Sequence, residues 1–176
     1  VLLAAAVALV RSSDVFQRQS GNLAFRRDLQ NQAERGFKTA VTLLSSGYLS
    51  TDSLRYTTNT TYNYSAIQLA SDDHGIPTAL LSDTAFTAAG KTANDITDSD
   101  TGVTVRWVID RQCVSTLEGS AFATGSCTTI SSGTTDASAD SRHKSVNASR
   151  RPVYRISVLA SGPHNTQLFM QATVVR

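Results

Sequence analysis

Two cysteines, Cys113 and Cys127, are the residues of this sequence best suited to covalent chemistry. In an oxidising compartment a disulfide between them would close a short loop and stabilise the fold by about 3 kcal/mol. The alternative is a pair of reduced, buried thiols. Zinc binding would need more ligands than the sequence groups together. Cys113 has no evident histidine partner, and neither G-x-S-x-G nor C-x-x-C occurs in the residues that follow, so a nucleophilic enzyme is unsupported.

Carboxylates gather at two turns, where they could serve acid–base chemistry or bind a cation. His74 follows Asp72 and Asp73. Such a trio at a turn is more often structural, because a metal or catalytic site needs further convergent groups. Residues 94–102 (NDITDSDTG) offer several oxygen ligands, but the glutamate that would complete a helix–loop–helix calcium site is missing. We therefore expect a turn that leads into a strand, with a calcium site of another type left open around Asp95–Asp100.

Two further motifs could contact phosphate groups. Gly90-Lys91-Thr92 matches the end of a phosphate-binding loop, but Ala85 replaces the first glycine that the loop backbone requires. We therefore expect neither a nucleotide nor another cofactor. The net charge of +2 is too small to indicate a nucleic-acid-binding protein. A basic group without interleaved aromatic residues favours a solvated loop or a charged contact over a DNA site; it comprises Arg142, His143, Lys144, Arg150 and Arg151.

The element that must organise the chain is one long N-terminal helix that ends near Ser46. It opens with an uninterrupted apolar run, VLLAAAVALV, and continues with apolar residues at every third or fourth position. No proline occurs before Pro77, and Gly47 supplies a C-terminal stop. The apolar stripe comprises Phe25, Leu29, Ala33, Phe37, Ala40, Val41 and Leu44, and the opposite face carries Arg26, Arg27, Asp28, Gln30, Glu34, Arg35 and Lys38.

The first half of this helix, residues 1–20, needs a partner beyond a small domain. Its apolar run is too short to span a bilayer, which takes about 20 residues. It does not fit a cleaved secretory signal, because no basic region precedes it. We expect the chain to begin inside a longer hydrophobic helix. The alternative is an N-terminal helix buried in an ordinary core.

Downstream, β-branched and aromatic residues predict a small antiparallel sheet. Residues 103–109 (VTVRWVI) would bury their odd-numbered side chains, from Val103 to Ile109. Residues 153–160 and 167–175 also alternate, and the intervening Ser-Gly-Pro-His-Asn-Thr has the composition of a hairpin loop.

Two segments predict irregular structure. Residues 48–66 read as a surface connection that enters an edge strand around Tyr62–Leu69. Residues 115–150 are rich in Ser, Thr, Gly, Ala and Asp and predict a long loop region.

Short motifs, in order along the chain, resemble the PilX-like minor pilins of type IV pilus assembly systems, including those of betaproteobacteria. In that family an apolar helix is followed by a polar turn with a Gly-Asn pair and then by an Ala/Glu-rich amphipathic half. Here these are Gly21-Asn22 and Ala33-Glu34, with the usual run of alanines reduced to Gln-Asn-Gln-Ala. The globular part contributes Gly75-Ile76-Pro77, Asn94-Asp95-Ile96, Ile109-Asp110-Arg111-Gln112-Cys113, Tyr154-Arg155-Ile156, Ser161-Gly162-Pro163 and Asn165-Thr166-Gln167.

The resemblance implies an α+β pilin fold. The half-helix 21–44 would lie across an antiparallel sheet and form one core with it. Residues 1–20 would project for membrane anchoring and filament packing, and residues 21–176 would form the globular domain. A Cys113–Cys127 disulfide would hold the variable loop region 115–150. Packing against partner helices would fall to Leu2, Leu3, Val7, Leu9, Val10 and Phe16.

The implied function is noncatalytic, with no metal or cofactor. The chain would assemble with other minor pilins to initiate a type IV pilus and would sit at its tip with the major pilin and a large adhesin. It would occupy the inner membrane and periplasm of a Gram-negative bacterium first and the extracellular pilus later. One alternative is a pseudopilin of type II secretion. The other is a secreted surface- or carbohydrate-binding module whose Tyr56, Tyr62 and Tyr64 contact the ligand.

Overall fold

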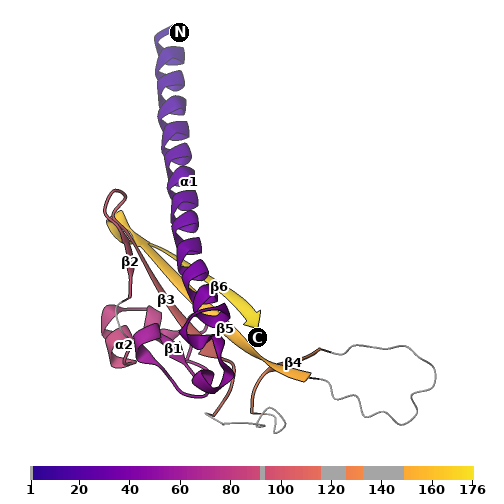
Figure 1. Ribbon diagram of the computed structural model, residues 1–176. Coiled ribbons are helices and arrows are strands. Elements are labelled where there is room, and N and C mark those ends of the chain that lie inside the picture. The colour runs from indigo at the N-terminus through magenta and orange to yellow at the C-terminus, as the bar shows by residue number, and fades with distance from the viewer. Residues whose placement is uncertain (1, 92–93, 116–125, 133–148) are drawn as a thin grey trace, which may run out of the picture.

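The computed structural model describes residues 2–91, 94–115, 126–132 and 149–176. It is a mixed α/β fold in which one long helix lies on a six-stranded sheet. The helix, α1 (Leu2–Ser45), runs for 44 residues without interruption, about 66 Å at the standard rise. Its C-terminal half crosses the sheet, while its N-terminal half extends beyond the domain (Figure 1). In the part of the chain that the structure describes, no helix combines the length and hydropathy that a membrane crossing requires.

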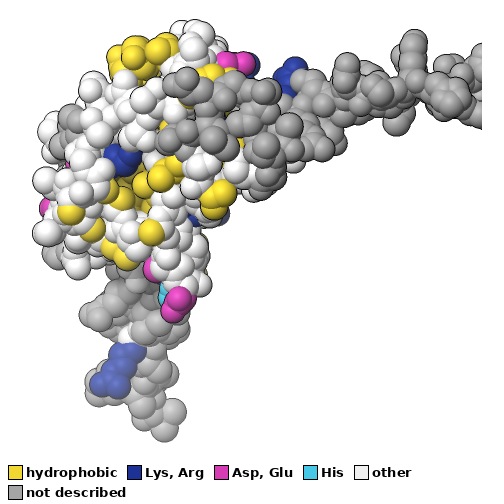
Figure 2. Space-filling view, turned by 90° about the horizontal axis from the view of Figure 1, so that it is seen from below, with side chains coloured by type: hydrophobic (Ala, Val, Ile, Leu, Met, Phe, Trp, Pro, Cys, Tyr) yellow, Lys and Arg dark blue, Asp and Glu magenta, His cyan; other side chains and the backbone are white. Residues whose placement is uncertain are grey.

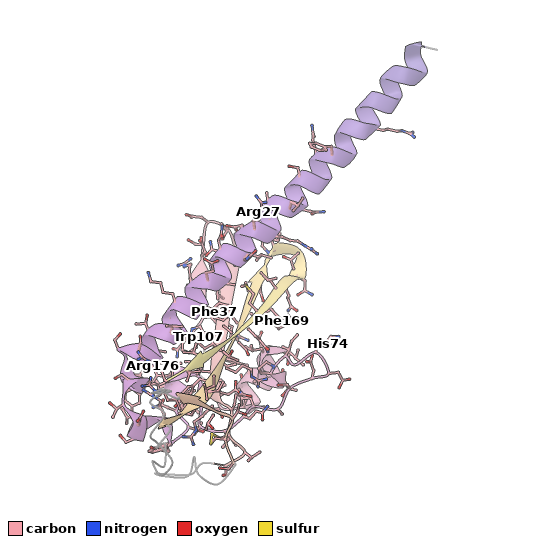
Figure 3. All side chains as sticks on the ribbon, turned by 90° about the vertical axis from the view of Figure 1, so that its right-hand side faces the viewer. Arg27, Phe37, His74, Trp107, Phe169 and Arg176 are labelled. Carbon is pink, nitrogen blue, oxygen red and sulfur yellow. A yellow bond between two sulfur atoms is a disulfide. The ribbon has the colours of Figure 1, made fainter. Side chains whose placement is uncertain are left out.

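The predicted apolar stripe of the helix is the face that meets the sheet, with one exception. Val41 is exposed, whereas Gly36, five residues earlier, is buried. The period of 3.6 residues explains the shift, because Leu29, Ala33 and Gly36 continue the stripe better than Val41 does. Phe37 reaches toward the sheet residue Trp107 from the flank of this stripe (Figure 3). The buried helix residues are Leu29, Ala33, Gly36, Ala40 and Leu44.

Four of the five pairings between described strands are antiparallel, and β1–β3 is parallel. The long strand β5 is central, because β3 pairs with one side of it and β6 with the other. The three predicted strand segments are therefore neighbours in one sheet, as expected. The strands are β1 (Tyr64–Ser65), β2 (Ile96–Asp98), β3 (Val103–Arg111), β4 (Thr129–Ser132), β5 (Ser149–Gly162) and β6 (Thr166–Val175).

The predicted core between the helix stripe and the inward strand residues is confirmed, but the sheet is covered on both faces and a second cluster was not predicted. Odd-numbered residues of β3, such as Trp107, pack under α1 with even-numbered residues of β5, such as Ile156. A second, smaller cluster on the opposite face joins Val108 and Leu159 to Leu80 and Phe86. The second cluster is covered by a short 3₁₀ helix (Thr78–Leu80) and by α2 (Asp83–Ala88), which the Ser82 hydroxyl caps.

Three local predictions differ from the structure. The predicted edge strand around Tyr62–Leu69 is only the two residues of β1, since the chain before it forms 3₁₀ turns. The predicted loop 115–150 contains β4, which pairs with the start of β5. The hairpin between β5 and β6 is tighter than predicted. The remaining 3₁₀ helices are Tyr48–Ser50, Asp52–Arg55, Thr60–Tyr62 and Pro163–Asn165.

Gly36 lets the helix approach the sheet closely. A Cβ atom added to Gly36 would lie 2.9 Å from Cγ1 of Val105 and 2.9 Å from Cγ1 of Val158. We expect Gly36→Val to lower the free energy of unfolding by about 1–3 kcal/mol through overpacking. Gly21→Val is the matched control, because Gly21 lies in the same helix and a Cβ there would meet nothing within 4 Å. Equal stabilities of the two variants in urea titrations would contradict the close approach.

Candidate functional site

The projecting part of α1 displays large apolar side chains that the domain does not cover. Phe16 is 72% exposed and Leu23 is 60% exposed. Together with Ala24 and Arg27 they line a shallow hollow of about 340 Å³ on the helix. Exposed aromatic and aliphatic side chains grouped on one element are typical of an interaction surface. Phe16 is therefore accessible on the projecting helix, and its helix-packing role stays a prediction.

The other predicted packing residues lie nearer the N-terminus of the same helix. Their positions belong to the described backbone of α1, which extends away from the sheet (Figure 1). Their side chains lie outside the described part of the structure, so their packing role stays a prediction. These residues are Leu2, Leu3, Val7, Leu9 and Val10.

A larger groove of about 680 Å³ lies where α1 passes over β6. The helix contributes Leu23 and Phe25 to its lining, and the strand contributes Leu168 and Met170. The helical period identified Phe25 and Leu29 as apolar stripe residues, but it did not reveal a groove, because the groove forms only where two elements distant in the chain meet. The polar members of its lining are Arg26, Arg27, Gln30, Thr166 and Gln167, and Leu29 completes it.

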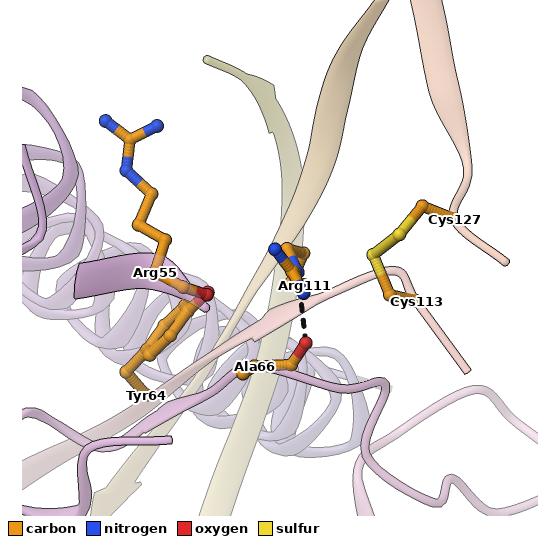
Figure 4. The surroundings of a disulfide bond; sticks show 6 residues. All are labelled: Arg55, Tyr64, Ala66, Arg111, Cys113 and Cys127. Carbon is orange, nitrogen blue, oxygen red and sulfur yellow. Dashed lines mark hydrogen bonds between the residues drawn. A yellow bond between two sulfur atoms is a disulfide. The ribbon is translucent and has the colours of Figure 1, made fainter. Parts of the chain in front are cut away.

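The predicted disulfide is confirmed. Cys113 and Cys127 are joined just beyond the end of β3, at the end of the domain away from the helix N-terminus (Figures 1 and 4). Backbone hydrogen bonds flank the bridge: the Val114 amide donates to the Ser126 carbonyl at 2.8 Å, and the Thr128 amide donates to the Gln112 carbonyl at 2.8 Å. The disulfide therefore extends the antiparallel pairing of β3 and holds the start of β4 in place.

A buried cluster of aromatic and basic side chains lies next to the disulfide (Figure 4). The Arg111 Nε donates to the Ala66 carbonyl at 3.0 Å, and its guanidinium lies 5.5 Å from the centre of the Tyr56 ring. The Tyr64 hydroxyl donates to the Arg55 carbonyl at 2.6 Å. Burial raises the pKa of the Tyr64 hydroxyl well above its ordinary value. This cluster holds the 48–66 connection against the sheet.

Asp110 is the centre of a buried hydrogen-bond network on the face of β3 that points away from α1. Its carboxylate is fully buried and accepts from the Arg155 guanidinium at 2.8 and 3.0 Å. It also accepts from the Leu69 amide at 3.1 Å and from the Gln112 side-chain amide at 2.8 Å. Arg155 in turn donates to the carbonyls of Leu69 and Gly75. The network fastens the 69–77 turn to the sheet.

In the acidic turn where a calcium site was left open, Asp95 and Asp98 accept hydrogen bonds from an arginine side chain and from backbone amides. Asp95 accepts from Arg106 at 2.7 and 3.0 Å. Asp98 accepts from the backbone amides of Asp100 and Thr101, which hold the pKa of its carboxyl below the usual range. No group of three or more His, Cys, Asp or Glu side chains in the described ranges is arranged to hold a metal ion.

His74 and Lys91 each have a structural setting. The His74 side chain is 85% exposed at the tip of a peripheral turn (Figure 3), and the Asp72 carboxylate accepts from the His74 and Ile76 amides. Lys91 follows the end of α2 and is buried, and its Nζ donates to the Tyr64 carbonyl at 3.3 Å. Desolvation lowers the pKa of the Lys91 amine, and the nearby Asp110 opposes this shift. The Lys91 amine therefore binds a backbone carbonyl in the domain interior and is not positioned as in a phosphate-binding loop.

The three tyrosines of the ligand-binding alternative do not share one surface. Tyr64 is fully buried, Tyr56 stacks with Arg111, and Tyr62 stacks with Tyr48 at 4.7 Å between ring centres. Of the predicted basic group, Arg142, His143 and Lys144 lie outside the described residues. The side chain of Arg150 does so too, whereas Arg151 is exposed on β5.

The chain matches no protein-family model, and neither the curated proteins nor the solved structures include one with significant similarity to it. Its function must therefore be inferred from the arrangement of its own elements. The features that distinguish it are the projecting apolar helix, the groove beneath that helix and the disulfide at the far end of the domain.

Proposed function

We propose that this chain is a noncatalytic minor pilin that assembles with other minor pilins to initiate a type IV pilus. The observation that carries the proposal is the single helix α1, half of which packs on the sheet while the other half extends free of the domain with an apolar N-terminal sequence. The order of the PilX-like motifs along the chain supports the same assignment. A pilin fold accounts for the helix, the sheet and the disulfide together.

The physical mechanism is burial of the apolar helix against the helices of neighbouring subunits. Burial contributes about 25 cal/mol for each Å² of apolar surface removed from water. The proposed neighbours are other minor pilins and the major pilin, with the inner membrane as the earlier environment of the helix. Exposed Phe16, at 72%, would be a contact at the domain end of this packing surface.

The opposite end of the domain would meet the tip adhesin on the extracellular pilus. Figure 2 views the domain from that side, where the described surface is mostly uncharged and apolar patches lie between polar ones. Such a surface costs little to desolvate compared with a charged one. The Cys113–Cys127 disulfide would help to hold this surface in place.

Phe16→Glu tests the helix-packing role in the full-length protein. We expect at least a tenfold loss of surface pili when this variant replaces the wild-type protein in the source bacterium, because a carboxylate would enter an apolar helix interface. Gln17→Glu is the matched control, since Gln17 is the adjacent exposed helix residue and should be close to wild type. Pili are counted by electron microscopy, and protein levels are compared by immunoblot.

The same strains distinguish the two related assemblies. A pseudopilin of type II secretion would leave pili intact, and Phe16→Glu would instead reduce the export of secreted enzymes. Normal pili and normal secretion in the Phe16→Glu strain would contradict both filament functions. A soluble binding module would then be the better assignment.

A further inference from the structure

β6 is an edge strand with free hydrogen-bonding groups along one side. The Arg176 amide donates to the Pro152 carbonyl, whereas the Gln112 amide donates to the Val153 carbonyl. Even-numbered residues of β5 therefore bond toward β6, and odd-numbered residues bond toward β3, because the direction alternates along an antiparallel strand. In β6 the register then turns the N–H and C=O groups of the odd residues outward: Gln167, Phe169, Gln171, Thr173 and Val175. No strand in the described ranges pairs with this side.

Among the described residues, this edge has none of the usual protections against pairing with another chain. β6 is 10 residues long, and its sequence TQLFMQATVV contains no charged residue and no proline. Soluble proteins commonly protect such edges with lysine, proline, a bulge or a covering loop. A long, uncharged and unpaired edge is therefore a template for strand addition.

The groove under α1 runs beside the same edge. Its strand side is formed by Leu168 and Met170, whose side chains point to the α1 face of the sheet and are only partly buried. A strand added to β6 would continue the sheet and direct every second side chain toward this groove. One extended segment with alternating apolar side chains could therefore pair with the free backbone edge and fill the apolar groove.

The charges at the groove select among partners. Arg26 and Arg27 are both exposed, and both line the groove. Neither forms an ion pair with a described residue. A second copy of β6 would bring no acidic residue to them, because the strand has none and Arg176 follows it. A partner with a carboxylate near this end of the groove would complement them.

We propose that the free edge of β6 binds an extended segment of another protein by strand addition. The segment carries apolar residues at alternate positions, which enter the groove under α1, and an acidic residue that pairs with Arg26 or Arg27. The main-chain hydrogen bonds supply affinity, and the groove and the arginines supply specificity. This inference is independent of the pilus assignment, because it rests on β6 and its groove alone.

Selection from a displayed library of random ten-residue peptides tests the proposal on the full chain. We expect enriched sequences to alternate apolar residues and to contain Asp or Glu. Thr173→Pro should weaken their binding at least tenfold, because proline removes an outward N–H while leaving the bonds to β5 in place. Thr173→Ala is the matched control, since it keeps that N–H, and it should bind as the wild type does.

Two further measurements separate strand addition from other modes of binding. A synthetic copy of an enriched peptide should slow hydrogen exchange of the outward amides of β6, and N-methylation of its alternate amides should abolish binding. The double variant Arg26→Glu, Arg27→Glu should bind more tightly to a peptide in which lysine replaces the acidic residue than to the acidic peptide itself. Equal binding by Thr173→Pro, tolerance of N-methylation, no enrichment, or enrichment without acidic residues would overturn the proposal. Light scattering that shows a dimer of the wild type and a monomer of Thr173→Pro would also overturn it, because the occupant of the edge would then be a second copy of this chain.

Discussion

Replacing Asp110 with alanine is expected to lower the free energy of unfolding by about 3–5 kcal/mol, the cost of breaking a buried ion pair by removing one partner. The Asp110 carboxylate is fully buried, and its partner Arg155 has a side chain that is only 11% exposed. The variant leaves the Arg155 charge without its carboxylate and the Leu69 amide without its acceptor. Urea denaturation followed by circular dichroism measures the change.

Asp83→Ala is the matched control for this prediction. Asp83 also forms a short ion pair, 2.6 Å from Arg106, but its side chain is 91% exposed. Exposed pairs contribute at most about 1 kcal/mol, and Arg106 keeps a second partner in Asp95. If Asp110→Ala lowers the free energy of unfolding no more than Asp83→Ala does, the buried network does not hold the 69–77 turn on the sheet.

Removing the disulfide is expected to lower the free energy of unfolding by about 3 kcal/mol. The bridge closes a loop with a sequence separation of 14, and the stabilisation comes mainly from restricting the unfolded chain. The variant is Cys113→Ser with Cys127→Ser, which avoids a lone reactive thiol. Urea denaturation compares it with the oxidised wild type.

Reduction of the wild-type protein is the internal control for the disulfide prediction. Reduced wild type and the double serine variant should unfold at similar urea concentrations, both below the oxidised protein. Because the bridge lies away from the α1 interface, Gly36→Val should have the same effect in the oxidised and reduced proteins. Identical stability with and without the bridge would contradict its structural role.

The sequence was most informative where one local period decides the structure. The 3.6-residue stripe located the buried face of α1, and the alternation in residues 103–109 located the buried face of β3. It failed at Val41, because a broad apolar stripe does not reveal which flank meets the sheet. Val108 and Leu159 were also missed as core residues, because the cover on their face comes from Leu80 and Phe86, which are distant in the chain.

The proposed interaction surfaces were predictable only in part. The apolar run of residues 1–10 is visible in the composition, whereas Phe16 was named only through the family resemblance. The groove does not, because α1 and β6 meet there from opposite ends of the chain. The absence of charge in residues 166–175 was visible in the sequence, but only the sheet order shows that this strand lies at an edge.

The alignment of α1 with the sheet also determines how the domain responds to mechanical force. In Figure 1 the helix N-terminus lies at one end of the molecule, and β6 runs from the side of the domain nearer to it toward the other end. Tension between these ends would therefore act along the strands. The β5–β6 pairing from Val153–Val175 to Gly162–Thr166 would be loaded in shear, so that its hydrogen bonds resist together and do not open one after another like a zipper.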